Sequence, residues 1–193
     1  MQGKFKVHTI DSAPDGAQPM LQKVEKGMGQ IPNILRVMAT SPAALEGYLA
    51  LSGIFNGKAQ FTPVEAHVIL QTINHESGCD YCMTAHAVMA VGSHAVSAEL
   101  DSLLRDGKPL TDARLEALRL FTAAMVSKRG WIETSDLDVF LAAGFTQAHV
   151  LGDILGIGLK VISNYTNHVA QTPLDDSFAG AFRKLTASKS AAE

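Results

Sequence analysis

The two cysteines of the chain stand three residues apart in Cys79-Asp-Tyr-Cys82, and His86 follows one helical turn after the second cysteine. In a helix the two thiols share a face at a Cβ separation of roughly 5–6 Å, which a small adjustment closes to the disulfide value of about 3.8 Å. His86 lies on the same face, where an imidazole can take the thiol proton, stabilise the thiolate as imidazolium and later protonate a leaving group. These three residues predict a thiol redox centre with its own acid–base partner.

The thiols are expected in the first turn of a helix. Gly78 precedes Cys79, and an unbroken helix-forming run covers residues 83–91. Unpaired N–H groups and the helix dipole favour a thiolate at such a position. Because Cys82 is within one turn of His86, it is predicted to be the more reactive thiol, and Cys79 the resolving partner.

Composition excludes several classes of partner. The formal charge is −3, and the 16 Lys and Arg residues are scattered, so no basic stripe indicates nucleic-acid binding. Residues 1–11 lack the apolar core of a signal peptide, and Asp153 and Lys160 interrupt the longest apolar stretch. We therefore expect a cytoplasmic protein with no membrane or nucleic-acid partner. In that reducing compartment, a CxxC pair is more often catalytic, redox-sensing or metal-binding than structural.

Helical periodicity runs through the chain, and no alternating β-branched run appears, so the predicted fold is all-α. Residues 1–16 are expected to form an N-terminal arm, residues 17–186 a single helical domain, and residues 187–193 a polar tail. The helix at 150–169 is apolar almost all round, which predicts a central helix or a subunit interface. The expected helices cover about 18–28, 34–39, 42–54, 63–73, 79–92, 95–104, 113–126, 135–141, 150–169 and 175–185.

Several local motifs occur together in this helical pattern. They are Gly78-Cys79-Asp-Tyr-Cys82-Met-Thr-Ala-His86, Ile31-Pro-Asn33, Ala143-Gly-Phe145, and Asn164-Tyr165 followed by Thr172-Pro-Leu-Asp175. With these motifs, residues 30–180 resemble the carboxymuconolactone decarboxylase family and, within it, the alkylhydroperoxidase AhpD-like branch. The decarboxylase branch works without this CxxC, so the cysteine pair favours the peroxidase-like branch.

The resemblance implies an AhpD-like helical fold, with the CxxC on a central helix–turn–helix and subunits assembled as homo-trimers or hexamers. It also implies that Cys82 attacks a small hydroperoxide, that Cys79 resolves the product and that His86 serves in a proton relay. A dithiol donor of thioredoxin or lipoyl type would then restore the thiols. We expect no cofactor and no metal.

One position departs from the family pattern. The family's relay also uses a glutamate twelve residues before the first cysteine, and His67 stands there in this chain. Glu65 is two residues too early and is explained as the third residue of a capping box that begins at Thr62. Either His67 replaces the glutamate, or Glu76 supplies a carboxylate from the corner before Cys79, or the relay is weak.

Other interpretations of the cysteines remain open. The pair could serve a general disulfide oxidoreductase or a redox sensor, or the protein could be a lyase of the decarboxylase kind. Cys79, Cys82 and His86 could bind zinc with His75 or His67 as the fourth ligand, although structural zinc usually takes paired ligand clusters and a second cluster is missing. Two inert thiols in a structural oligomer are the remaining alternative.

Overall fold

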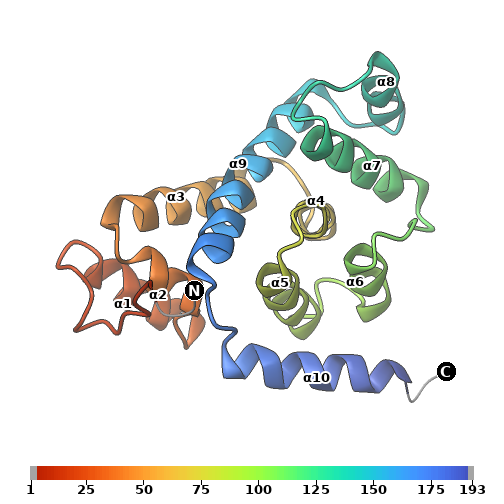
Figure 1. Cartoon of the computed structure of the whole chain (residues 1–193). Helices are drawn as coiled ribbons and strands as arrows, with labels where there is room; N and C mark the ends of the chain where they lie inside the picture. Colours follow the sequence, from red (N-terminus) through yellow and green to blue (C-terminus); the bar gives the residue numbers. More distant parts are fainter. Residues whose placement is uncertain (1–3, 191–193) are drawn as a thin grey trace.

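The computed structural model describes residues 4–190, with side chains as far as residue 187, and this part of the chain forms ten α-helices and no strand (Figure 1). The all-α prediction is confirmed. The helices are α1 (Gln18–Met28), α2 (Asn33–Met38), α3 (Pro42–Lys58), α4 (Pro63–Glu76), α5 (Asp80–Gly92), α6 (Ala98–Arg105), α7 (Ala113–Ser127), α8 (Thr134–Ala142), α9 (Gln147–Ala170) and α10 (Asp176–Ser190).

The centre of the molecule is α4, which packs against α5, α6, α7 and α9 (Figure 1). All residues of α4 from Glu65 to Asn74 are buried, and Val68, Ile69 and Ile73 belong to the main hydrophobic core. The apolar 150–169 helix was expected to be central or to lie in a subunit interface; α9 contacts α2, α3, α4, α5 and α7 with one side and leaves apolar residues exposed on the other. The polar residues of α4 between Glu65 and Asn74 are covered by the neighbouring helices.

The start of α4 is fixed as its sequence predicts. The backbone N–H of Glu65 donates to Thr62 Oγ1 at 3.2 Å, and the N–H of Thr62 donates to Glu65 Oε2 at 2.9 Å, which completes the capping box. Glu65 also pairs with Arg114 of α7 at 2.9 Å. At the other end, Gly78 adopts φ +62°, a conformation that favours glycine, and turns the chain directly into α5. The predicted helix–turn–helix at the thiols is therefore present.

Gly156 allows α9 to approach α3 and α4 closely. A Cβ on Gly156 would lie 2.9 Å from Phe55 Cε2 and 3.1 Å from Ile69 Cγ2, so no larger residue fits without a shift. One turn earlier along the same face, Thr122 Oγ1 of α7 donates to Asp153 Oδ1 at 2.6 Å inside the core. Glycine and a buried carboxyl group thus fix the position of α9.

Some helix and domain boundaries differ from those expected. The α3 helix continues past Gly57 to Lys58. The α10 helix runs to Ser190, into the segment expected as a tail, because adding a residue to an existing helix costs less than starting one. Residues 191–193 lie outside the described part. Before α1, the buried Ala13 belongs to a second apolar cluster with α1 and α2, so the expected arm is anchored on these helices.

Within residues 4–190 no individual helix has both the length and the apolarity to cross a bilayer; only α8 and α9 taken together, with a bend of 113° between them, meet that test of length and composition.

Candidate thiol site

The cysteines begin α5. Cys79 is its N-cap residue and Cys82 lies in its first turn, where the sequence placed them. Both are free thiols, and their exposed fractions are 1% and 4%. The structure thus describes the dithiol state, with both sulfurs inside the protein.

Polar groups around Cys82 favour its ionised form. The Cys79 thiol donates to the Cys82 sulfur, the charge of Lys160 attracts it, and Asn167 Nδ2 donates to Cys82 Sγ at 3.2 Å. Together with Ser163 these groups lower the pKa of Cys82 to about 5, against the opposing effect of burial. The same pairing and burial raise the pKa of Cys79. At neutral pH, Cys82 is therefore the thiolate and Cys79 the thiol.

The cation next to this thiolate is Lys160 of α9. Its exposed fraction is 1%, and Nζ donates to His86 Nε2 at 3.1 Å. Burial and the charges of Lys160 and His67 lower the pKa of His86 well below its usual value. His86 is therefore neutral at neutral pH and accepts from Lys160. The imidazolium expected from the sequence is replaced by an ammonium group.

A cavity of about 570 Å³ opens beside Cys82. Its walls come mainly from apolar side chains of α2, α3, α4, α5 and α10, among them Leu49, Met89 and Phe178. None of its lining residues in the described part of the chain is Asp, Glu or Arg, and Lys160 provides the charged group near the thiol. A ligand in this cavity meets an apolar surface with a thiolate at one end.

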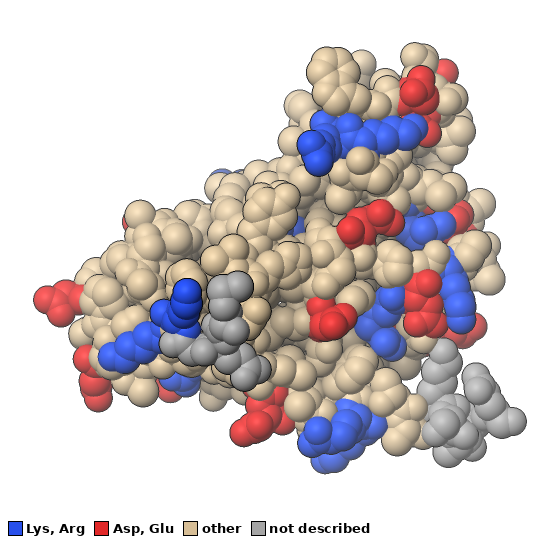
Figure 2. All heavy atoms as spheres, viewed as in Figure 1, with Lys and Arg blue, Asp and Glu red and all other residues tan. Residues whose placement is uncertain are grey.

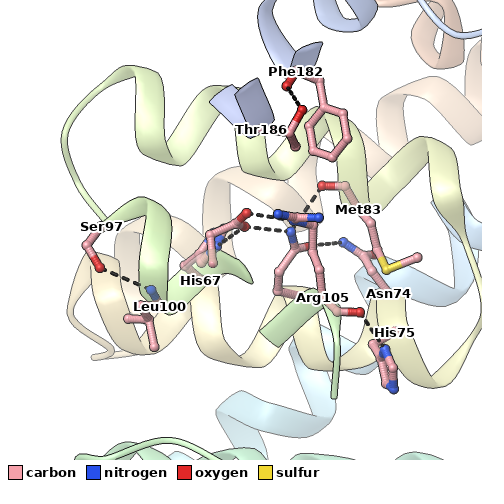
Figure 3. Close-up of polar contacts among 11 residues, drawn as sticks. His67, Asn74, His75, Met83, Ser97, Leu100, Arg105, Phe182 and Thr186 are labelled. Atoms are coloured by element: carbon pink, nitrogen blue, oxygen red, sulfur yellow. Dashed lines mark hydrogen bonds and ion pairs between the residues drawn. The ribbon is translucent and has the colours of Figure 1, made fainter. Parts of the chain in front are cut away.

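His67 also lines this cavity, and a buried carboxylate holds its ring (Figure 3). His67 Nε2 donates to Asp101 Oδ1 at 3.0 Å, Gln71 Nε2 donates to the same oxygen at 2.8 Å, and Arg105 Nε donates to Asp101 Oδ2 at 2.8 Å. Burial raises the pKa of Asp101, but these three donors outweigh burial and lower it. Asp101 is ionised and can only accept, so the proton of His67 is on Nε2.

Glu76 lies apart from these groups. Its side chain is exposed at the end of α4 and is not among the residues that line the cavity. The pKa of Arg119 on α7 is raised mainly by its hydrogen bond to Glu116, and the charge of Glu76 adds to this effect. The structure thus brings Cys79, Cys82, His86 and His67 to one site and places Glu76 outside it.

Sequence reasoning missed Lys160, Ser163, Asn167 and Asp101 as site residues. The first three carried a usable signal, because residues 153, 160, 163 and 167 repeat at helical spacing and form a polar stripe on an otherwise apolar helix. Lys160 was used only as an interruption of the apolar stretch. Asp101 gave no comparable signal in its short helix.

The zinc alternative finds no support in the described residues, which contain no group of three His, Cys, Asp or Glu side chains arranged to hold a metal ion. The two candidate fourth ligands have other partners. His67 is bonded to Asp101, and His75 Nδ1 lies 2.9 Å from the carbonyl oxygen of Arg105.

No family model and no curated protein matches the chain. Solved structures do match. An uncharacterised peroxidase-related protein from Silicibacter sp. TM1040 superposes with a TM-score of 0.78 at 22% identity, covering 94% of this chain and 97% of that one. A second, described as an alkylhydroperoxidase AhpD core and an uncharacterised peroxidase-related protein from Ralstonia eutropha JMP134, gives 0.80 at 17% identity, covering 91% and 93%.

The chain has the AhpD-like fold. The same fold is found in the debrominase Bmp8, whose complex with 2,3,4-tribromopyrrole superposes with a TM-score of 0.77 at 13% identity, covering 96% of this chain and 98% of that one. At these identities the likeness establishes the fold, and the AhpD-like fold therefore occurs with more than one activity.

Proposed function

We propose that this AhpD-like protein reduces organic hydroperoxides through a dithiol–disulfide cycle of Cys82 and Cys79. The observation that carries the proposal is the position of Cys82. Its pKa is lowered to about 5 by Cys79, Lys160 and Asn167, and its side chain lines a cavity of about 570 Å³. A thiolate that faces a ligand-sized cavity is equipped for nucleophilic attack.

In the proposed cycle, the Cys82 thiolate attacks the terminal oxygen of the hydroperoxide. The S–O bond forms as the O–O bond breaks, and the departing alkoxide takes a proton to leave as an alcohol. The Cys79 thiol then attacks the sulfenic acid at Cys82, which forms the disulfide and releases water. A dithiol donor of thioredoxin or lipoyl type reduces this disulfide and is itself oxidised.

Each site residue has a proposed role. Lys160 and Asn167 stabilise the thiolate, and His86, bonded to Lys160, keeps that ammonium in place and belongs to the proton relay. His67 takes the place of the family's relay glutamate. Glu76 has no part in the proposal because it lies outside the cavity.

The cavity supports a neutral organic substrate. Its apolar walls would bury a hydrocarbon group. An anionic ligand would be repelled by the Cys82 thiolate, and the cation among the lining residues, Lys160, is already paired with that thiolate. Two structural neighbours are described as peroxidase-related, which agrees with a peroxide substrate. We propose further that the protein works in the cytoplasm as a homo-trimer or hexamer.

The first test is consumption of cumene hydroperoxide by the reduced protein. The wild type should consume one equivalent per chain and lose two hydrogen masses, because a disulfide forms within one chain. Cys79→Ser should consume one equivalent and stop at the sulfenic acid of Cys82, while Cys82→Ser should consume none. Full consumption by Cys82→Ser, or disulfide-linked dimers on a non-reducing gel, would contradict the cycle.

Turnover with a recycling donor separates an enzyme from a redox sensor. A peroxidase continues to consume hydroperoxide when dithiothreitol or reduced thioredoxin is supplied, whereas a sensor or a general disulfide oxidoreductase closes the same disulfide without sustained peroxide turnover. If hydroperoxide is not consumed continuously in the presence of donor, the protein is not a peroxidase, and the dithiol pair serves a sensor or a disulfide oxidoreductase.

A second candidate function is reductive debromination of halogenated heteroaromatics. It is favoured by the apolar cavity at the thiolate and by the debrominase among the structural neighbours. Cys82 would take the bromine as a sulfenyl bromide while the ring carbon gains a proton, and Cys79 would then displace bromide to form the disulfide. Release of bromide from 2,3,4-tribromopyrrole by the reduced protein tests this function separately from peroxide consumption.

A further inference from the structure

Asp101 of α6 is fully buried, with an exposed fraction of 0%, and contacts His67, which lines the cavity. Its Oδ1 accepts from His67 Nε2 at 3.0 Å and from Gln71 Nε2 at 2.8 Å. Its Oδ2 accepts from Arg105 Nε at 2.8 Å. In Figure 3, His67 of α4 and Arg105 of α6 lie close together in this network. Gln71 and Arg105 therefore hold the two oxygens of the Asp101 carboxylate in place, including the oxygen that accepts from His67.

The other donors are themselves held. Gln71 Nε2 also donates to the backbone carbonyl of Met83 at 3.0 Å, and Asn74 Nδ2 donates to Gln71 Oε1 at 2.9 Å, so the Gln71 amide has one orientation. Arg105 stacks over the Phe182 ring of α10, with its guanidinium carbon 4.9 Å from the ring centroid. The network thus joins the His67 ring to the first turn of α5, at the residue directly after Cys82.

From this geometry we infer that Asp101 is a positioning residue for His67 and that the pair supplies the proton to the alkoxide released when Cys82 attacks the hydroperoxide. The inference rests on the proposed hydroperoxide reduction. Asp101 fixes Nε2–H inside the network, which leaves Nδ1 as the ring nitrogen available to a ligand in the cavity. A carboxylate bonded to Nε2–H also compensates the positive charge that His67 carries when Nδ1 is protonated.

The proton transfers balance over the cycle. The His67 imidazolium gives the Nδ1 proton to the alkoxide when the O–O bond breaks, so alcohol, sulfenic acid and neutral imidazole result. Attack of Cys79 on the sulfenic acid releases water and leaves the ring neutral. Reduction of the disulfide by the dithiol donor restores the Cys82 thiolate and the Cys79 thiol and frees one proton, which returns to His67. Asp101 stays ionised throughout.

A double-mutant cycle tests the inference through kcat for cumene hydroperoxide with a saturating dithiol donor. His67→Gln should lower kcat roughly 10²-fold, because an amide can still donate to Asp101 but cannot transfer a proton. Asp101→Asn should lower kcat at least about tenfold, with KM little changed. In the double variant, Asp101→Asn should cause no further loss, because its effect passes through His67.

Asp106→Asn is the matched control, since Asp106 caps the C-terminal end of the same helix but is exposed. It should turn over like the wild type, and every variant should alkylate Cys82 with iodoacetamide at the wild-type rate, which reports an intact thiol site. Equal losses from Asp101→Asn in the wild-type and His67→Gln backgrounds would make Asp101 merely structural. Wild-type protein without peroxide turnover would instead overturn the proposed function and this inference with it.

A measurement on the unaltered protein covers the case in which Asp101→Asn does not fold. Ring ¹⁵N NMR of the wild type, recorded at a pH high enough to deprotonate the His67 ring, should show the Nε2–H tautomer. A dominant Nδ1–H tautomer would overturn the inference, because Nε2 could then not donate to Asp101.

Discussion

Lys160 is a buried cation whose described hydrogen-bond partner is a neutral imidazole, His86. A buried charge needs a counter-charge to offset the cost of removing it from water, and the Cys82 thiolate is that counter-charge. The thiolate and the ammonium therefore depend on each other. Oxidation of Cys82 to the disulfide removes the negative charge and leaves Lys160 with His86 alone.

This dependence predicts the titration of Cys82. In the wild type, thiolate ultraviolet absorbance and the iodoacetamide alkylation rate should both rise with pH around the Cys82 pKa of about 5, since the deprotonated form absorbs and reacts. Lys160→Met removes the charge and keeps the length of the side chain, so the midpoint should move upward by at least about one pH unit. Lys108→Met removes an exposed charge as a control and should leave the midpoint in place, and an unmoved midpoint in Lys160→Met would contradict the pairing.

At this scale, local spacing predicted only part of the site. Cys79, Cys82 and His86 fall within two turns of one helix, so their relative positions follow from helix geometry alone. Lys160 reaches His86 across 74 residues and Asp101 reaches His67 across 34, and such contacts depend on how helices pack. The departure at His67 was visible in the sequence, but its carboxylate partner was not.

At the scale of elements, one helix, α9, carries most of the site residues that sequence reasoning missed. The inner face of α9 presents Asp153, Lys160, Ser163 and Asn167, all buried. Its extent was predicted approximately, as 150–169 against Gln147–Ala170 in the structure, because apolar periodicity indicates a helix but not its exact ends. The helices that pack against this face could not be predicted from the sequence. They are α2, α3, α4, α5 and α7, which are spread over most of the chain.

Asp153 gives α9 a pH-dependent contact with α7. Burial raises the pKa of this carboxyl to about 7, with the Thr122 hydrogen bond opposing it. A folded-state pKa above the unfolded value of about 3.9 means that the folded state binds more protons between the two values. The Asp153 contribution to the free energy of unfolding is therefore full below pH 4 and is lost as pH rises to about 7.

The lowered pKa of Cys82 makes the free energy of unfolding rise with pH, opposite to the effect of Asp153. The difference in that free energy between Asp153→Asn and the wild type cancels the Cys82 contribution and isolates the effect of Asp153. In urea unfolding the variant should gain stability relative to the wild type between pH 5 and pH 7.5, by about 1 kcal/mol or more, and the gain should level off above that range. Asp138→Asn, on an exposed position of α8, should show no such trend. A pH-independent difference for Asp153→Asn would contradict the raised pKa.

At the scale of the whole molecule, the outer side of α9 is apolar and uncovered. Leu151, Ile154, Val161 and Tyr165 recur at spacings of three, seven and four residues and are exposed by 68%, 45%, 38% and 60%. Figure 2 shows mainly uncharged atoms along the middle of this helix. The resemblance to the AhpD-like branch implies a homo-trimer or hexamer, and this strip is the surface that we expect such an assembly to bury.

Val161→Glu places a charge in the middle of this strip and should convert the assembly to smaller species in multi-angle light scattering, because an unpaired carboxylate is costly in a closed interface. Val139→Glu, at a valine of α8 that is exposed by 55%, is the control and should leave the molar mass unchanged. A wild-type protein that is monomeric at micromolar concentration would refute the expected oligomer.

The tight contact at Gly156 links backbone packing to thiol chemistry. Lys160 is one helical turn beyond Gly156, so any side chain that lifts α9 from Phe55 and Ile69 also draws the ammonium away from the Cys82 sulfur. The titration midpoint of a single sulfur thus reports the fit between two helices in the core. Variants of α9 and α3 can then be ranked optically by how far each displaces the helix, without a new structure for each one.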